Sequence, residues 1–147
     1  MARSTRGFTL VELLVVLLLF ALTAGLASLA LPDPAASRLE QEGARLAALL
    51  EAGRAEARVS GVAVRFELAD PDAEEAFRFV GLPPRIRLPQ RWLNDGVQAR
   101  IVGARALVLG PEPLIGAQRV ELQLGQRRLT LATDGLAPFR ALDEVGS

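Results

Sequence analysis

The sequence predicts an α+β protein, in which a long N-terminal helix precedes a small antiparallel, β-sandwich-like domain. An apolar run from Gly7 to Leu31 carries a single formal charge, at Glu12. Beyond Ser60 the apolar residues change from a spacing of three and four to strict alternation, which is typical of half-buried strands. A chain of 147 residues has room for one ordinary domain beside such a helix.

The apolar run is expected to be the membrane-spanning half of the N-terminal helix, over residues 8–31. About 20 apolar residues, rising about 1.5 Å each, are enough to cross the hydrocarbon core of a bilayer. Residues 1–7 form a short leader that contains Arg3 and Arg6. By the positive-inside rule these arginines predict a cytoplasmic N-terminus and an exported C-terminal domain.

The second half of the helix is expected over residues 32–59, after a break at Pro32 and Pro34, because proline disfavours helix at the residue before it. Ser37 and Glu40 have the spacing of a capping box, which predicts that the helix restarts at Ser37. An apolar stripe then follows at helical spacing, and we expect it to pack on the domain's own sheet rather than on a coiled-coil partner. The stripe comprises Leu39, Gly43, Leu46, Leu50, Gly53 and Ala57, and the charged residues assigned outside it are Arg38, Glu42, Arg45, Arg54 and Arg58.

The β-rich domain is expected over residues 60–147. Alternating apolar residues predict strands at 62–68, 77–79, 86–88, 97–102, 104–109, 119–124 and 128–132, with a last short segment at 136–142. The first two strands are expected to form a hairpin around an acidic turn, residues 70–75. Gly125-Gln126 predicts the turn of a second hairpin.

The composition removes most catalytic chemistry. The chain has no histidine, no cysteine and no lysine, so it cannot build a Ser-His-Asp triad, a Cys-His pair or a Schiff base, and the usual zinc ligands are missing. We therefore expect no enzyme, no cofactor and no metal. Calcium binding at the acidic turn stays open, since Asp70 and Glu75 bound a stretch rich in hard oxygen donors, although it lacks the EF-hand spacing.

Three interpretations compete for the N-terminus. An ordinary secretory signal peptide with a cleavage site near Ser28-Leu29-Ala30 has a shorter apolar core than this one. A plain single-pass anchor tolerates Glu12 without explaining it. A carboxylate within an apolar membrane segment is costly unless it is paired or neutralised, so Glu12 is a candidate functional residue.

The third interpretation rests on the string Gly7-Phe8-Thr9-Leu10-Val11-Glu12, behind an arginine-bearing leader and ahead of an unbroken apolar run. This string resembles the class III signal of type IV pilins and type II secretion pseudopilins. The resemblance implies that a prepilin peptidase cleaves between Gly7 and Phe8 and that Phe8 is then N-methylated. It also implies that Glu12 is the family's glutamate, which is able to pair with the new amino terminus of a neighbouring subunit. The expected location is the bacterial inner membrane, with a single span, a cytoplasmic N-terminus and a periplasmic C-terminal domain.

A looser similarity, over residues 107–139, is to the GspH (XcpU-type) minor pseudopilins. It implies a subunit near the tip of a short periplasmic filament, with other pseudopilins as partners and a secretin or a secreted protein as further candidates. A FimT/FimU-type minor pilin, for pilus assembly or DNA uptake, stays open as an alternative, as does an exported enzyme or ligand-binding domain. Nucleic acid is disfavoured as a partner because the net charge is zero and the C-terminal tail is acidic, although Arg127-Arg128 and Arg85, Arg87 and Arg91 are available to form one basic face.

Overall fold

The computed structural model describes residues 8–29 and 33–142, and it describes the side chains of the first helix as far as Thr23. The chain divides into two compact units, Met1–Asp33 and Pro34–Ser147. The predicted α+β class is confirmed, because an N-terminal helix is followed by a small domain that contains antiparallel sheets.

The first unit contains the helix α1 (Leu10–Leu29). The Thr9 hydroxyl accepts a hydrogen bond from the Glu12 backbone N–H at 3.3 Å, which satisfies one of the unpaired donors at the start of the helix. Glu12 lies in the first turn, where a negative charge is favourable to the helix dipole. Within the described residues, neither helix combines the length and the apolar character needed to cross a bilayer.

The second unit begins with α2 (Pro34–Ser60). The helix therefore starts three residues before Ser37, and the predicted capping-box start is wrong. Pro34 is at the first helical position, where its missing N–H costs nothing because that donor has no partner within a helix. Pro32, the other residue of the predicted break, lies outside the described residues.

Two antiparallel sheets follow α2, with the strand orders β2-β1-β4 and β3-β5-β6-β7. Both predicted hairpins are confirmed: β1 pairs with β2, with Phe66 opposite Phe79, and β5 pairs with β6, with Val120 opposite Leu131. The strands are β1 (Arg65–Leu68), β2 (Phe77–Val80), β3 (Gln98–Ile101), β4 (Ala106–Val108), β5 (Gln118–Leu124), β6 (Arg127–Thr133) and β7 (Arg140–Leu142).

The strand predicted at residues 86–88 is wrong, because this segment is an irregular loop. The Ile86 backbone N–H donates to the Pro83 carbonyl at 2.9 Å, which makes a local turn. Pro83, Pro84 and Pro89 have no N–H to give to a sheet ladder, so the alternation of apolar residues between them has no strand partner to pair with.

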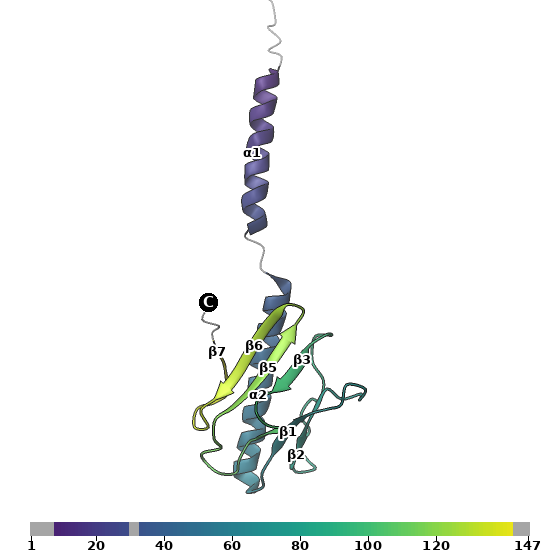
Figure 1. Ribbon diagram of the computed structural model, residues 1–147, viewed down its shortest axis with the longest axis vertical. Coiled ribbons are helices and arrows are strands. Elements are labelled where there is room, and N and C mark those ends of the chain that lie inside the picture. Colours follow the sequence, from purple (N-terminus) through teal and green to yellow (C-terminus); the bar gives the residue numbers. More distant parts are fainter. Residues whose placement is uncertain (1–7, 30–32, 143–147) are drawn as a thin grey trace, which may run out of the picture. The chain divides into compact units, whose positions relative to one another are not determined.

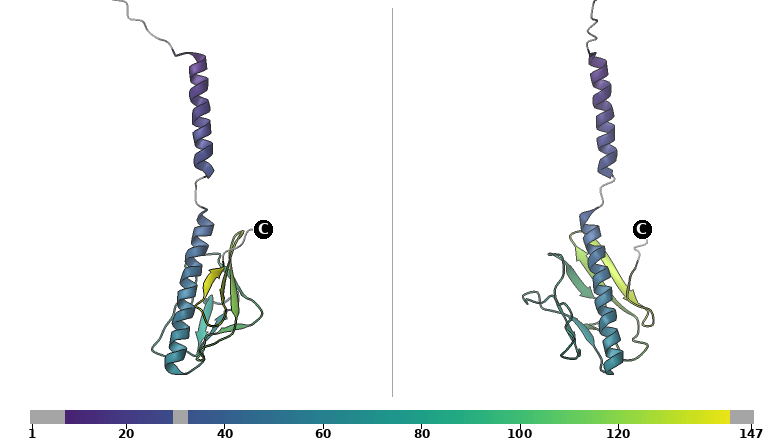
Figure 2. Two further views of the ribbon diagram at one scale, coloured as in Figure 1. Left: turned by 90° about the vertical axis from the view of Figure 1, so that its left-hand side faces the viewer. Right: turned by 180° about the vertical axis from the view of Figure 1, so that it is seen from behind.

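Within the second unit, α2 lies along one side of the two sheets (Figures 1 and 2). The predicted apolar stripe does pack on the sheets, and two of its residues are glycines that let the helix come close. A Cβ at Gly43 would collide with Leu129 on β6, and one at Gly53 would lie 2.9 Å from Leu109. The buried apolar core comprises Leu39, Leu46, Leu50, Ala57, Val64, Phe66, Phe77, Leu107, Leu109, Val120, Leu122, Leu131 and Phe139.

The Gln118 side chain joins the two sheets. Its Oε1 accepts from the Val108 backbone N–H at 2.7 Å, and its Nε2 donates to the Val108 carbonyl at 2.9 Å. This amide therefore pairs with the outer edge of β4 as a neighbouring strand would, while Gln118 itself begins β5. The amide therefore satisfies the two edge groups of Val108, which would otherwise be open to another chain.

Candidate functional site

The predicted processing site lies at the N-terminal end of α1. Gly7 is outside the described residues, and Phe8 and Thr9 precede the first helical residue, Leu10. The Phe8 side chain is 70% exposed. Phe8 is not part of the helix, and the Thr9 carbonyl accepts from the Leu13 backbone N–H at 3.1 Å, so the helical hydrogen bonds begin one residue after Phe8.

Glu12 is exposed in the first turn of α1, and within the described residues its carboxylate has no hydrogen-bond or ion-pair partner. The apolar side chains from Leu10 to Leu22 are also largely exposed. A continuous exposed apolar surface of this kind is typical of a site that contacts lipid or another protein.

The second unit holds two buried charges that the sequence analysis assigned outside the apolar stripe. Glu42 is 0% exposed and Arg54 is 1% exposed, so that assignment is wrong for both. Glu42 lies four residues before Leu46, and Arg54 lies four residues after Leu50, so both belong to the buried face. This spacing is the signal that would have found them.

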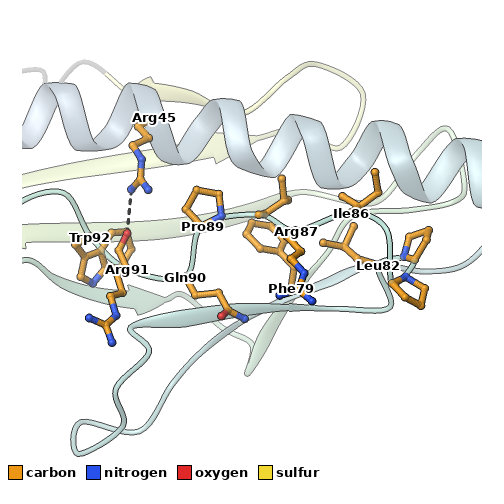
Figure 3. A pocket seen from close by; sticks show the side chains of 12 residues that line it. Arg45, Phe79, Leu82, Ile86, Arg87, Pro89, Gln90, Arg91 and Trp92 are labelled. Atoms are coloured by element: carbon orange, nitrogen blue, oxygen red, sulfur yellow. Dashed lines mark hydrogen bonds between the residues drawn. The ribbon is translucent and has the colours of Figure 1, made fainter.

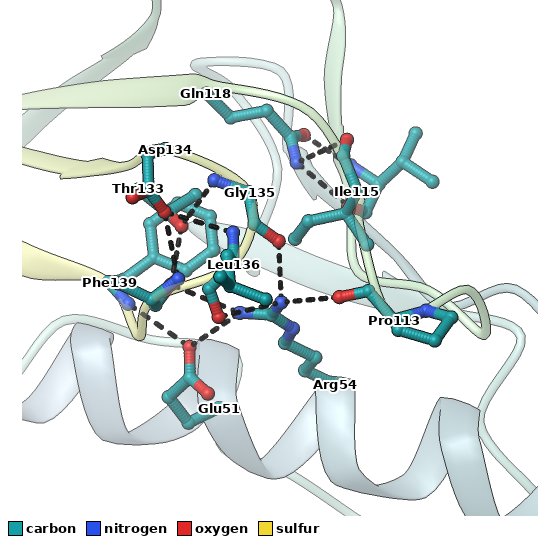
Figure 4. Close-up of polar contacts among 12 residues, drawn as sticks. Glu51, Arg54, Pro113, Ile115, Gln118, Thr133, Asp134, Gly135, Leu136 and Phe139 are labelled. Carbon is teal, nitrogen blue, oxygen red and sulfur yellow. Dashed lines mark hydrogen bonds and ion pairs between the residues drawn. The ribbon is translucent and has the colours of Figure 1, made fainter.

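Arg54 donates to the backbone carbonyls of two loops (Figure 4). Its guanidinium nitrogens reach Gly135 at 2.6 Å, Ala137 at 3.1 Å, Pro113 at 3.2 Å and Leu136 at 3.3 Å. Glu51, one turn earlier in α2, lies 3.9 Å from Arg54 and accepts from the Phe139 backbone N–H at 3.1 Å. A buried charge is tolerated when hydrogen bonds replace water in this way.

Glu42 holds a third loop. One carboxylate oxygen accepts from the backbone N–H groups of Leu93 at 2.9 Å and Asn94 at 3.2 Å, and from the Asn94 side chain at 3.2 Å. The other oxygen accepts from Arg45 at 3.1 Å. All of these partners are backbone groups or fixed side chains, so Glu42 and Arg54 are positioned to order the loops rather than to carry out a reaction.

Asp134 caps the turn before β7. Its carboxylate accepts from the backbone N–H groups of Ala137 at 2.8 Å and Leu136 at 2.9 Å. These two hydrogen bonds, the Ala137 one first, lower the pKa of Asp134 below its ordinary value. Elsewhere in the described part of the chain, no group of three or more carboxylates gathers closely enough to hold a metal ion, and this includes the acidic turn.

A groove of about 670 Å³ lies between α2 and the loop of residues 82–92 (Figure 3). Three arginines line it, Arg45, Arg87 and Arg91, with no acidic residue among its lining side chains. Trp92 lies at one end of the groove and packs against Phe77, with ring centroids 4.6 Å apart. The sequence analysis missed this groove because it treated part of the loop as a strand.

Comparison with known families gives one match, over residues 2–28, to the prokaryotic N-terminal methylation motif. This motif is the class III signal peptide of type IV pilin-like proteins, and it supports the pilin-like family for this chain. The matched residues include Gly7, Phe8 and Glu12 and most of α1, whereas α2 and both sheets lie outside the match. Comparison with curated proteins and with solved structures finds no match to this chain.

The motif indicates a type IV pilin-like or pseudopilin protein. It is typical of structural subunits that are substrates of a prepilin peptidase and that assemble into pilus-like filaments. It also implies anchoring in the bacterial inner membrane.

Proposed function

We propose that this chain is a minor pseudopilin of the GspH type, a structural subunit near the tip of the type II secretion pseudopilus. In this role it promotes the export of folded proteins across the outer membrane. The observation that carries the proposal is the methylation motif at residues 2–28, joined to an α+β domain of one long helix and two small antiparallel sheets.

The proposed maturation begins with cleavage between Gly7 and Phe8 by a prepilin peptidase, followed by N-methylation of Phe8. Residues 8–31 then anchor the chain in the inner membrane with a single span, while the domain lies in the periplasm. The exposed apolar side chains of α1 support this step, since lipid and neighbouring helices are the surroundings in which they are stable.

Glu12 is the proposed assembly residue. Its carboxylate has no partner within the described residues, and cleavage creates a cationic amine at Phe8, four residues away. In a stack of helices, the Glu12 of one subunit pairs with the amine of its neighbour, so that neither charge stays uncompensated in an apolar environment. Such a pair fixes the register between helices, which is the best-attested use of a buried charge.

The mature N-terminus tests the pilin-like class directly. Intact mass and N-terminal sequencing of the full chain, expressed with a prepilin peptidase, should give a chain that starts at methylated Phe8. A mature chain that starts at Leu31 would instead show ordinary signal-peptide cleavage and would remove both the processing and the assembly proposal.

A minor type IV pilin of the FimT/FimU type is the second candidate, because the methylation motif is shared by both systems. A deletion strain separates the two. Loss of exoprotein export with normal twitching and DNA uptake supports the secretion role, whereas the opposite pattern supports the pilus role.

A further inference from the structure

The arginine-lined groove is preformed. The Gln90 carbonyl accepts from the backbone N–H groups of Ala76 at 2.8 Å and Phe77 at 3.2 Å, so the loop is tied to the turn end of the β1–β2 hairpin. The three prolines of this loop fix backbone torsions, and Trp92 is packed against Phe77. Binding of a ligand in this groove therefore requires little further ordering of the loop, so it costs little conformational entropy.

One of the three arginines of the groove is open to an anionic partner. Arg87 is exposed, and it has no ion pair or side-chain hydrogen bond within the described part of the chain. Arg45 is held by Glu42 and by the Arg91 carbonyl, so its position is fixed. Apolar side chains lie between these arginines, namely Phe79, Leu82, Ile86 and Leu88. An apolar surface with arginine and tryptophan at its margin is typical of a protein interface.

The acidic turn, residues 70–75, lies next to this groove. Its four carboxylates belong to Asp70, Asp72, Glu74 and Glu75, and all four residues are exposed. The turn is ordered by the hydrogen bond from the Ala73 N–H to the Asp70 carbonyl at 3.0 Å. Trp92 separates the two features, since it borders both the groove and the hollow beside the turn.

The turn does not neutralise its own chain's groove. Its closest approach is Glu74 to Arg91 at 3.9 Å, with the two side chains 94% and 71% exposed. A pair that long and that exposed contributes little to stability. The molecule thus presents a cationic groove and an acidic turn side by side. Within the described residues, Arg87 in the groove has no ion pair, and neither do three of the four carboxylates of the turn, those of Asp70, Asp72 and Glu75.

We propose that the groove binds the acidic turn of a second copy of this chain, in a two-fold contact in which each turn enters the other copy's groove. Adjacent patches of opposite sign make a surface that is complementary to itself, which is what a two-fold contact requires. Electrostatic complementarity of this kind sets the orientation of the partners and suppresses wrong ones. The inference uses only the second unit, so it does not depend on the proposed pilin-like role.

A protein partner fits the groove better than nucleic acid does. Three arginines neutralise at most about three phosphates, whereas DNA-binding proteins make about 6–10 such contacts. Bases are usually held by stacking on open aromatic faces, and the Trp92 ring is half-buried against Phe77.

Cysteine cross-linking of the full chain tests the contact, because the natural sequence contains no cysteine. A chain carrying Asp72→Cys and Pro84→Cys should form a covalent dimer on mild oxidation in detergent solution, since Pro84 is exposed and lines the groove, and all three groove arginines are kept. The matched control carries Asp72→Cys and Arg119→Cys, since Arg119 is an exposed arginine on β5 that does not line the groove. Equal dimer yields from the two pairs, or a ladder of larger products from the first, would overturn the two-fold contact.

Charge-reversal variants without added cysteines give a second test of the contact. For each variant, analytical sedimentation measures the fraction of chains in the dimer. Arg87→Glu should weaken dimerisation by at least about tenfold, the effect of about 1.4 kcal/mol. Adding Asp72→Arg to Arg87→Glu should restore it, and Arg119→Glu should leave it unchanged. Both residues are exposed, so the variants are expected to fold, and circular dichroism checks this.

The same measurements distinguish a second copy of this chain from other ligands of the groove. Raising salt to 1 M should dissociate the dimer, because the screening length falls to about 3 Å. An unchanged dimer with Arg87→Glu, or no rescue by Asp72→Arg, would rule out this contact. An Arg87-dependent complex with a single-stranded oligonucleotide or an unrelated acidic peptide, stronger than the dimer, would assign the groove to that ligand instead.

Discussion

Arg54 Nη2 donates to the Gly135 carbonyl oxygen at 2.6 Å, across 81 residues of sequence. The same carbonyl accepts from the Ile115 backbone N–H at 3.3 Å. One residue of α2 therefore fixes the two loops that flank the central hairpin of the second sheet. Since three of the four carbonyls that Arg54 contacts lie between β6 and β7, this side chain determines how the last strand joins the sheet.

Arg54→Ala is expected to destabilise the domain by about 3–5 kcal/mol, because it leaves several backbone carbonyls buried without donors. Chemical denaturation of the full chain measures the loss. Arg54→Lys should be intermediate, since an ammonium group has fewer donors and no planar fork. Arg58→Ala, an exposed arginine one turn later, is the control and should cost less than about 1 kcal/mol.

Gly135→Ala should cost more than about 2 kcal/mol. Gly135 has φ +99°, and an added Cβ would lie 2.6 Å from the Gly116 backbone nitrogen and oxygen, so the backbone of one of the two loops would have to shift. Gly125→Ala is the matched control, since Gly125 also has a positive φ, of +59°, but nothing lies within 4 Å of its added Cβ. Equal unfolding midpoints for the two variants would contradict the close approach of the two loops.

Gly43→Ala should cost about 1–3 kcal/mol, because its methyl group overlaps Leu129. The contact is with the end of a flexible side chain, so removing that side chain should relieve it. In a double-mutant cycle, Gly43→Ala is expected to be better tolerated in a Leu129→Ala background. Strictly additive effects would show that this glycine is not needed for helix–sheet contact.

Asp134 makes stability depend on pH in the acid range. Its folded pKa is below the ordinary value of 3.8, so the ionised form contributes stability above that value. The contribution is lost as pH falls through the lowered folded pKa, when protonation weakens the hydrogen bonds from Ala137 and Leu136. A carbon-13 titration of the Asp134 carboxyl group should show the lowered pKa. Asp134→Asn keeps an acceptor without the charge, and its stability should fall less than that of the unmodified chain on acidification.

Glu12→Ala should leave cleavage between Gly7 and Phe8 largely intact while abolishing co-assembly with other pilin-like subunits. Glu12→Gln keeps the size of the side chain and removes its charge, so it should fail in the same way if pairing with the Phe8 amine is what matters. Mass spectrometry reports processing, and cross-linking in membranes reports assembly. Normal assembly of both variants would refute the charge-pairing role.

The parts of the fold that sequence reasoning predicted are those set by neighbours along the chain. The two hairpins follow from alternation on both sides of a short turn, and the apolar stripe of α2 follows from its period. The failure at residues 86–88 has a cause of its own. The strand predicted at residues 86–88 has the right alternation, but prolines on both sides remove the donors of a ladder.

For the candidate site, the sequence by itself determined the motif that contains Gly7, Phe8 and Glu12, because these residues lie in one short contiguous stretch. The cleavage and assembly roles of these residues stay predictions. Only the tertiary structure decided the roles of Glu42 and Arg54 and the existence of the groove. The backbone groups that Glu42 and Arg54 bind are 51 to 83 residues away in sequence, and no local pattern encodes which backbone carbonyl or N–H group will meet a side chain after the sheets have formed.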